Sequence, residues 1–82
     1  MTCARVHLPH SLELLLRREL EEAIEQANLG RFDSAVAKKY LIERVPQIDI
    51  AIELDCERST ISRRLPEILR RIEQAAHRLN FI

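Results

Sequence analysis

The stretch QIDIAIELDCERSTISRRL, residues 47–65, decides the fold predicted for this chain of 82 residues. Its apolar side chains recur at helical spacing on either side of a three-residue link, residues 55–57, and the second helix would begin at Arg58. Such a short link forces a sharp corner, so the stretch predicts a helix-turn-helix unit. The apolar residues expected to face each other across the corner are Ile50, Ala51, Leu54, Ile61 and Leu65.

The composition favours one small helical domain. The chain has 46% apolar and 32% charged residues, one glycine and 4% aromatic residues, which is typical of a folded helical protein. Residues 1–10 should form a flexible N-terminal arm, and residues 11–82 a single domain. No apolar run approaches the roughly 18 residues of a membrane span. The first residues lack the layout of a signal peptide, so we expect a cytoplasmic protein.

Two helices are predicted before the motif. Apolar residues spaced three and four apart predict one helix over residues 11–28, which Gly30 would end in the left-handed conformation. The other should cover residues 34–44, with Asp33 as its N-cap. Pro46 suits the first turn of the helix that opens the motif.

A long final helix is predicted to begin at Arg58. Its apolar residues are spaced four, three, four, three and four apart, which is a heptad seam. Pro66 interrupts this run, because it removes a backbone hydrogen bond and crowds the carbonyl one turn earlier. The helix should therefore kink or re-start near Pro66, and the unbroken seam favours a kink. The predicted fold class is all-α, with about four helices. The seam residues are Ile61, Leu65, Ile68, Ile72, Ala75 and Leu79.

The motif resembles the helix-turn-helix of region 4 of bacterial sigma factors, and of small phage and bacterial regulators built on it. The likeness covers about residues 33–72, including the preceding helix AVAKKYLIERV. It departs from the family at Asp55, where Gly is usual, and at Glu57, where a Ser-like cap is usual. The resemblance implies a sequence-specific DNA-binding transcriptional regulator whose second motif helix enters the major groove. The residues that match the family pattern are Gln47, Ile50, Ala51, Leu54, Arg58, Ser59, Thr60, Ile61, Ser62, Arg63 and Arg64.

The start of a recognition helix supplies the expected base contacts. Arg58 or Arg63 could bind O6 and N7 of a guanine. Ser59 and Ser62 could contact bases or phosphates. Gln47, at the start of the supporting helix, could bind a phosphate together with the backbone N–H groups there.

Further residues have two interpretations each. Thr60 would either bond a phosphate or cap and pack the helix. Arg64, Lys38, Lys39 and Arg44 would either contact phosphates or form a solvated charged face. The charge distribution favours the DNA interpretation, although the net charge is zero. Residues 1–56 have seven Lys/Arg and ten Asp/Glu, whereas residues 57–82 have six Arg and three Glu.

Two isoleucines predict a second buried side on the first motif helix. Ile48 and Ile52 lie four apart, roughly opposite Ile50 and Leu54, so that this helix is apolar nearly all round. Either the helix over residues 11–28 covers them, or a second subunit does. The C-terminal seam would serve an intramolecular or a dimer contact equally. We expect a homodimer, whose two recognition helices would reach successive major grooves.

Other functions find little support. The chain has no glycine-rich loop, nucleophile elbow or paired His/acid motif, so we expect neither catalysis nor a cofactor. Cys3, His7 and His10 lack a fourth ligand at zinc-site spacing, so no metal site is predicted. His77 is interpreted as a surface or seam residue, and Cys56 as a small hydrophobe in the turn. The alternative function is a helical protein-interaction module that binds RNA polymerase, a sigma factor or another regulator.

Overall fold

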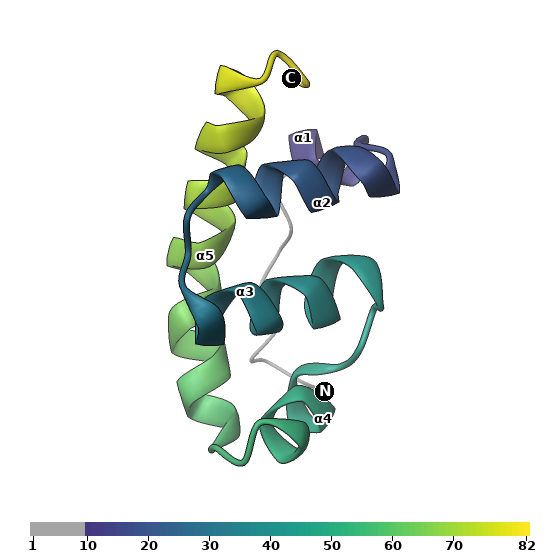
Figure 1. Cartoon of the computed structure of the whole chain (residues 1–82). Helices are drawn as coiled ribbons and strands as arrows, with labels where there is room; N and C mark the ends of the chain where they lie inside the picture. Colours follow the sequence, from purple (N-terminus) through teal and green to yellow (C-terminus); the bar gives the residue numbers. More distant parts are fainter. Residues whose placement is uncertain (1–9) are drawn as a thin grey trace.

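The chain forms a small helical domain built along one long helix. The structure, a computed structural model, describes residues 10–82, with the side chains of residues 10 and 11 left out. Within that range every regular element is a helix, which confirms the all-α prediction (Figure 1). The elements are α1 (His10–Glu13), α2 (Arg17–Gln26), α3 (Arg31–Ala37), the π-helical segment η1 (Lys38–Ile42), α4 (Gln47–Glu53) and α5 (Arg58–Arg78).

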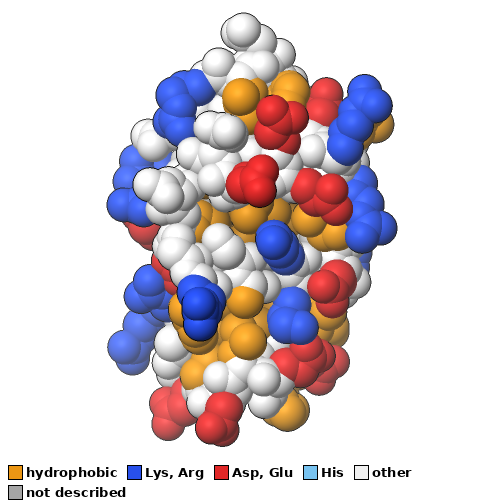
Figure 2. All heavy atoms as spheres, in the orientation of Figure 1, with side chains coloured by type: hydrophobic (Ala, Val, Ile, Leu, Met, Phe, Trp, Pro, Cys, Tyr) orange, Lys and Arg blue, Asp and Glu red, His pale blue; other side chains and the backbone are white. Residues whose placement is uncertain are grey.

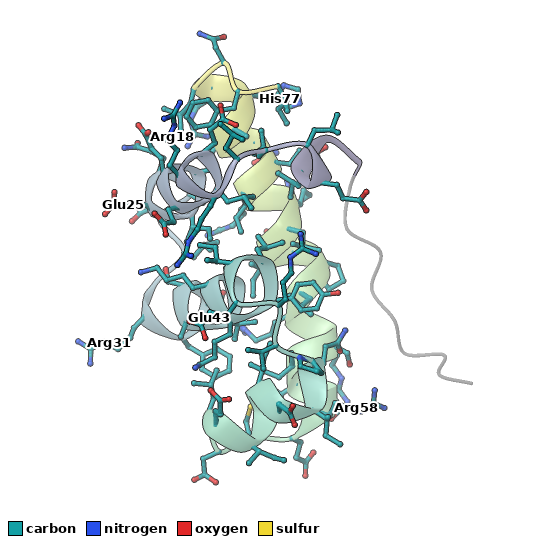
Figure 3. All side chains as sticks on the ribbon, turned by 90° about the vertical axis from the view of Figure 1, so that its right-hand side faces the viewer. Arg18, Glu25, Arg31, Glu43, Arg58 and His77 are labelled. Carbon is teal, nitrogen blue, oxygen red and sulfur yellow. The ribbon has the colours of Figure 1, made fainter. Side chains whose placement is uncertain are left out.

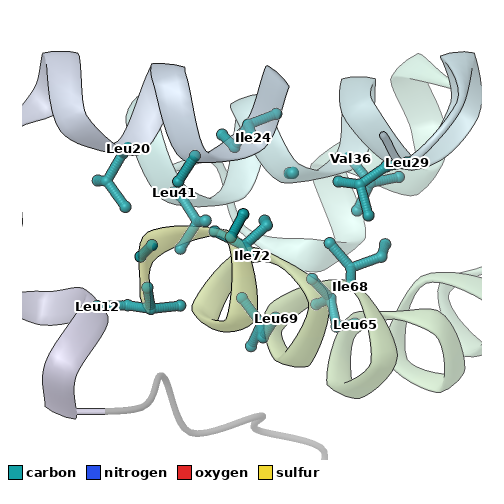
Figure 4. Packing of buried hydrophobic residues seen from close by; sticks show 14 of the residues in the cluster. Leu12, Leu20, Ile24, Leu29, Val36, Leu41, Leu65, Ile68, Leu69 and Ile72 are labelled. Atoms are coloured by element: carbon teal, nitrogen blue, oxygen red, sulfur yellow. The ribbon is translucent and has the colours of Figure 1, made fainter. Parts of the chain in front are cut away.

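One face of α5 forms the centre of the core. In Figure 1, α5 is a column, and α2, α3 and α4 lie against it one below another. Five of the six predicted seam residues are buried, all except the half-buried Leu79. Figure 4 shows the middle part of the seam pointing toward Ile24, Val36 and Leu41 from α2, α3 and η1. Each isoleucine or leucine buried in this way stabilises the fold by about 1.5–3 kcal/mol. The buried residues of α5 are Ile61, Leu65, Ile68, Leu69, Ile72, Ala75 and Ala76.

The prediction of a single helix over residues 11–28 is wrong, because the helix is interrupted between α1 and α2. Leu16 occupies the N-cap of α2, and its backbone N–H donates to the Glu19 carboxylate, with 2.9 Å between N and Oε1. This is the acidic half of a capping box, since leucine has no oxygen to return the bond. The break leaves Leu12 in the core at 1% exposure (Figure 4), while Leu14 and Leu16 are exposed.

The helix predicted over residues 34–44 starts and ends earlier, as α3 and η1. Gly30, with φ +92°, is the N-cap of α3, so Asp33 lies inside the first turn and is not the cap. The left-handed stop that we predicted at Gly30 is made instead by Asn28, with φ +56°. The connection between α2 and α3 is therefore residues 27–30, and both helix ends lie earlier in the chain than predicted.

The corner of the motif has the predicted form. Asp55 adopts the left-handed conformation, with φ +58°. Its backbone N–H donates to Ile52 O at 3.2 Å, and the N–H of Cys56 donates to Ala51 O at 2.9 Å, which together make a Schellman-type end to α4. Pro46 is the N-cap of α4, one residue before the position that we predicted. The half-buried Cys56 packs against the core.

α5 passes through Pro66 as one helix, so a re-start at that residue is wrong. Pro66 lies on the exposed face of α5, where water can hydrate the carbonyl oxygen that loses its backbone donor. Because Leu65 and Ile68 on either side of it are both fully buried, packing holds the two halves of α5 together.

Ile48 and Ile52 are exposed, so α2 does not cover them as one of our two alternatives required. Ile48 is 56% exposed and Ile52 is 72% exposed, whereas Ile50 on the other side of α4 is 0% exposed. Of the predicted seam, Ile61 to Ala75 is buried against other helices of the same chain, whereas Leu79, the C-cap of α5, is half-buried. Among residues 10–82, we find no helix with the length and apolar character needed to cross a membrane.

These exposures predict opposite results for two alanine substitutions on the same helix. Ile50→Ala should lower the free energy of unfolding by about 2–5 kcal/mol, because it leaves a cavity in the core. Ile52→Ala should change it by less than about 0.5 kcal/mol, because the side chain is in water. Urea denaturation of both variants measures the difference. An equally large loss for Ile52→Ala would mean that this face is buried in the protein in solution.

Candidate nucleic-acid interface

The face of α5 opposite the core is exposed, and we call it the outward stripe. Ser59, Arg63, Pro66 and Arg70 are spaced four, three and four apart, like the seam, and all four are exposed. This spacing places them along one line of the helix. The stripe starts at the corner of the motif, where a recognition helix would contact bases.

Arg58 and Arg63 are the free cations of this face. Neither has an ion pair or hydrogen bond within the described part of the chain, and both are exposed. Figure 3 shows Arg58 extending away from the body, at the opposite end of the molecule from Arg18. A guanidinium without a carboxylate partner keeps its planar set of donors for a guanine or a phosphate.

The hydroxyl groups at the start of α5 are close to the backbone and to Glu57. Ser62 Oγ donates to the carbonyl oxygen of Ser59 at 3.2 Å. Ser59 Oγ lies 3.5 Å from Glu57 Oε1, a long and weak hydrogen bond. Glu57 is the N-cap residue of α5, but its side chain does not cap the helix. Thr60 is half-buried. Base contact by Ser59 and Ser62, and phosphate contact by Thr60, stay predictions.

Arg64 has a partner in the fold, unlike Arg58 and Arg63. Its guanidinium donates two hydrogen bonds to Asp33, from Nε to Oδ1 and from Nη2 to Oδ2, both 2.7 Å long. It also lies over the ring of Phe32, 5.7 Å from the centroid. The bonds to Asp33 raise the pKa of Arg64. Arg64 therefore joins α5 to α3, and a phosphate would have to compete with Asp33 for it.

Two more arginines of α5 are paired with one carboxylate. Glu67 accepts hydrogen bonds from Arg70 at 2.7 and 3.1 Å and from Arg71 at 3.3 Å. The bonds from Arg70 lower the pKa of Glu67, and Arg71 adds to the effect. The pairs are three and four residues apart on an exposed helix face, so their spacing was visible in the sequence. The bond between Asp33 and Arg64 spans 31 residues and had no local signal.

The other residues predicted to contact phosphates differ in whether their side chains are exposed and whether they already have a partner. Gln47 is half-buried at the start of α4, and its Oε1 is buried without a hydrogen bond from any described residue. Lys39 donates to Glu53 of α4, which raises the pKa of Lys39. Lys38 and Arg44 are exposed. Of these four residues, only Lys38 and Arg44 have charged side chains that are exposed and available to bind a phosphate.

Charge changes sign at the corner of the motif. Residues 47–57 contain four acids and no Lys or Arg, whereas residues 58–71 contain five arginines and one acid. Figure 2 shows acidic side chains at the lower end of the molecule, over α4 and the turn. A ligand that approaches along α5 would therefore meet a basic helix next to an acidic one.

A hollow between α2 and the α3–η1 helix is a second candidate site. The charged residues that line it are four basic and four acidic ones. Figure 2 shows the two kinds interspersed on this face. Because the signs balance, the hollow gives no preference for an anionic or a cationic ligand. The charged lining residues are Arg17, Arg18, Arg31, Lys38, Glu21, Glu22, Glu25 and Glu43.

The histidines and cysteines that could be metal ligands or bases are only partly covered by the structure. His77 is exposed near the end of α5. Cys3 and His7 lie outside the described residues, as does the side chain of His10. Within residues 12–82 no three His, Cys, Asp or Glu side chains are arranged to hold a metal ion.

The lowered pKa of Glu67, which is paired with Arg70 and Arg71, predicts that the stability of the fold depends on pH. The folded-state pKa of Glu67 lies below the ordinary value. The stabilisation from these pairs is therefore present above the unfolded-state pKa and is lost as the pH falls through the folded-state pKa. Carboxyl NMR titration should give Glu67 a midpoint below the ordinary value for a glutamate. Arg70→Ala should raise the Glu67 midpoint toward the ordinary value, and Arg58→Ala should leave it unchanged. An unchanged midpoint in Arg70→Ala would contradict the assignment.

Comparisons with known proteins identify no relative. No family model matches the chain, and neither does any curated protein or solved structure. The resemblance to region 4 of sigma factors therefore stays a prediction from the residues.

Proposed function

We propose that this protein binds duplex DNA sequence-specifically and regulates transcription, with the first turns of α5 in the major groove. The observation that carries the proposal is the exposure of Arg58 and Arg63, which no described residue pairs with, at the start of a helix braced by α4. An arginine at this position can bind guanine through two hydrogen bonds, which is the commonest specific contact in the major groove.

The packing of α5 supports this proposal. Recognition needs a helix whose direction is rigid, because base contacts fail when the side chains are misplaced. The start of α5 is held by Ile61 and Leu65 in the core and by the bond from Arg64 to Asp33. The outward stripe is left to solvent by the same packing.

Arg63→Ala tests the proposed base contact. A binding site is first selected from a random duplex library, and fluorescence anisotropy then gives the affinity from about 50 to about 200 mM salt. The wild-type affinity should fall linearly on logarithmic axes, and Arg63→Ala should cost about 1–3 kcal/mol.

Arg18→Ala is the matched control, because Arg18 is an exposed arginine on α2 with no ion pair among the described residues. It removes the same charge from the opposite end of the molecule and should change the affinity little (Figure 3). A wild-type protein that retains no duplex at low salt would refute DNA binding. Equal losses in Arg63→Ala and Arg18→Ala would refute the assignment of α5.

Glu57→Gln tests the orientation of the motif. Glu57 is exposed at the N-terminal tip of α5, where its charge would repel phosphates. Removing that charge should raise the affinity for a random duplex about fivefold at low salt, and less at high salt. Glu22→Gln, on the exposed face of α2, should have no such effect. If Glu57→Gln binds no more tightly than wild type, the tip of α5 does not approach the phosphates.

The expected homodimer and the alternative function stay predictions. A palindromic selected site, together with sedimentation velocity at several concentrations, would test the dimer. A two-fold contact across α4 would bring Asp49 and Glu53 close to the same carboxylates of the second copy. The alternative, an interaction module for RNA polymerase, a sigma factor or another regulator, is favoured by one observation, the exposed isoleucines of α4.

A further inference from the structure

The exposed half of α4 consists of two stripes side by side. Ile48 and Ile52 form one stripe, four residues apart, with 56% and 72% of their surfaces exposed. Asp49 and Glu53 form the other, with the same spacing, and both are exposed. We call this surface the α4 face. No described residue covers the isoleucines, and Asp55 extends the acidic stripe into the turn.

The acids of the α4 face are mostly unpaired. Glu53 accepts a hydrogen bond from Lys39, but Asp49 and Asp55 have no ion pair within the described part of the chain. Residues 47–57 contain no Lys or Arg of their own. Two exposed isoleucines beside unpaired carboxylates are complementary to a partner surface that has apolar side chains next to basic ones.

A second copy of the chain fits this surface poorly. A two-fold contact would set the acidic stripe of one α4 face near that of the other, and like charges oppose such an approach. The outward stripe of α5 has arginines, but Pro66 is its one apolar member, so it offers no row of aliphatic side chains for Ile48 and Ile52. A helical segment has both features when Lys or Arg borders a row of aliphatic residues.

We propose that the α4 face is a docking surface for an amphipathic helix of another protein, with an aliphatic row against Ile48 and Ile52 and Lys or Arg against Asp49 and Asp55. The partner helix packs side by side with α4 and leaves the outward stripe of α5 free. This inference does not depend on DNA binding by α5.

Selection from a synthetic library tests the proposal. Displayed helical peptides of about 16 residues, with randomised surface positions, are selected on the wild-type protein and counter-selected on the double variant Ile48→Ser, Ile52→Ser. The enriched peptides should have aliphatic residues three and four apart, bordered by Lys or Arg. Enrichment without a basic bias, or no enrichment after counter-selection, would overturn the proposal.

An enriched peptide is then measured against single variants. Ile52→Ser should weaken its binding at least about tenfold. Leu14→Ser is the matched control, since Leu14 is an aliphatic side chain 68% exposed outside α4, and it should leave binding unchanged. Asp49→Asn with Asp55→Asn should weaken binding and flatten its salt dependence, whereas Glu22→Gln should not.

Two controls keep the result interpretable. Thermal unfolding should show that Ile52→Ser folds like wild type, as expected for an exposed side chain. Sedimentation of wild type without peptide tests for a second copy on this face. Self-association that Ile52→Ser abolishes would overturn the proposal in favour of a homotypic contact. Loss of peptide binding with unchanged DNA affinity in Ile52→Ser would support it.

Discussion

The burial of one face of α5 is the interaction on which the rest of the structure depends. The seam runs from Ile61 to Ala75 without a polar residue, and helices from three other parts of the chain pack against it. Because α5 is amphipathic, burying this face necessarily turns the opposite one outward. The core and the candidate interface are therefore two consequences of the same helical periodicity.

The arginines of α5 differ in whether the fold gives them a partner. Arg64 holds α5 against α3, Arg70 and Arg71 share Glu67, and Arg78 donates to the carbonyl oxygen of Gln26. Arg58 and Arg63 have no partner among the described residues. The unpaired arginines lie at the corner of the motif, next to the acidic α4. An anionic ligand on α5 and a cationic partner on α4 would therefore bind different sides of one corner. The turn at Asp55 makes that corner sharp, so the exposed faces of α4 and α5 lie on different sides of it.

The sequence predicted correctly the features that rest on apolar spacing over several helical turns, and wrongly some of the helix ends and caps between them. The two motif helices, the turn at Asp55 and the seam of α5 follow from spacing that repeats over several turns. The break after α1 and the cap at Gly30 do not, because each depends on one or two backbone bonds that several sequences can make. Asp33 shows the reason: it is a good N-cap by type, yet its carboxylate is bound by Arg64 from a distant helix.

By itself, the sequence determined the helical class, the helix-turn-helix corner and the apolar face of α5, because helical periodicity is local and is written in the order of residues. Only the tertiary structure decided which charges are paired, which side of α4 is exposed and that the C-terminal seam is internal. These properties depend on residues that are far apart in the chain. Ile48, Ile50 and Ile52 have the same chemistry, and packing alone buries one of them and leaves the other two in water.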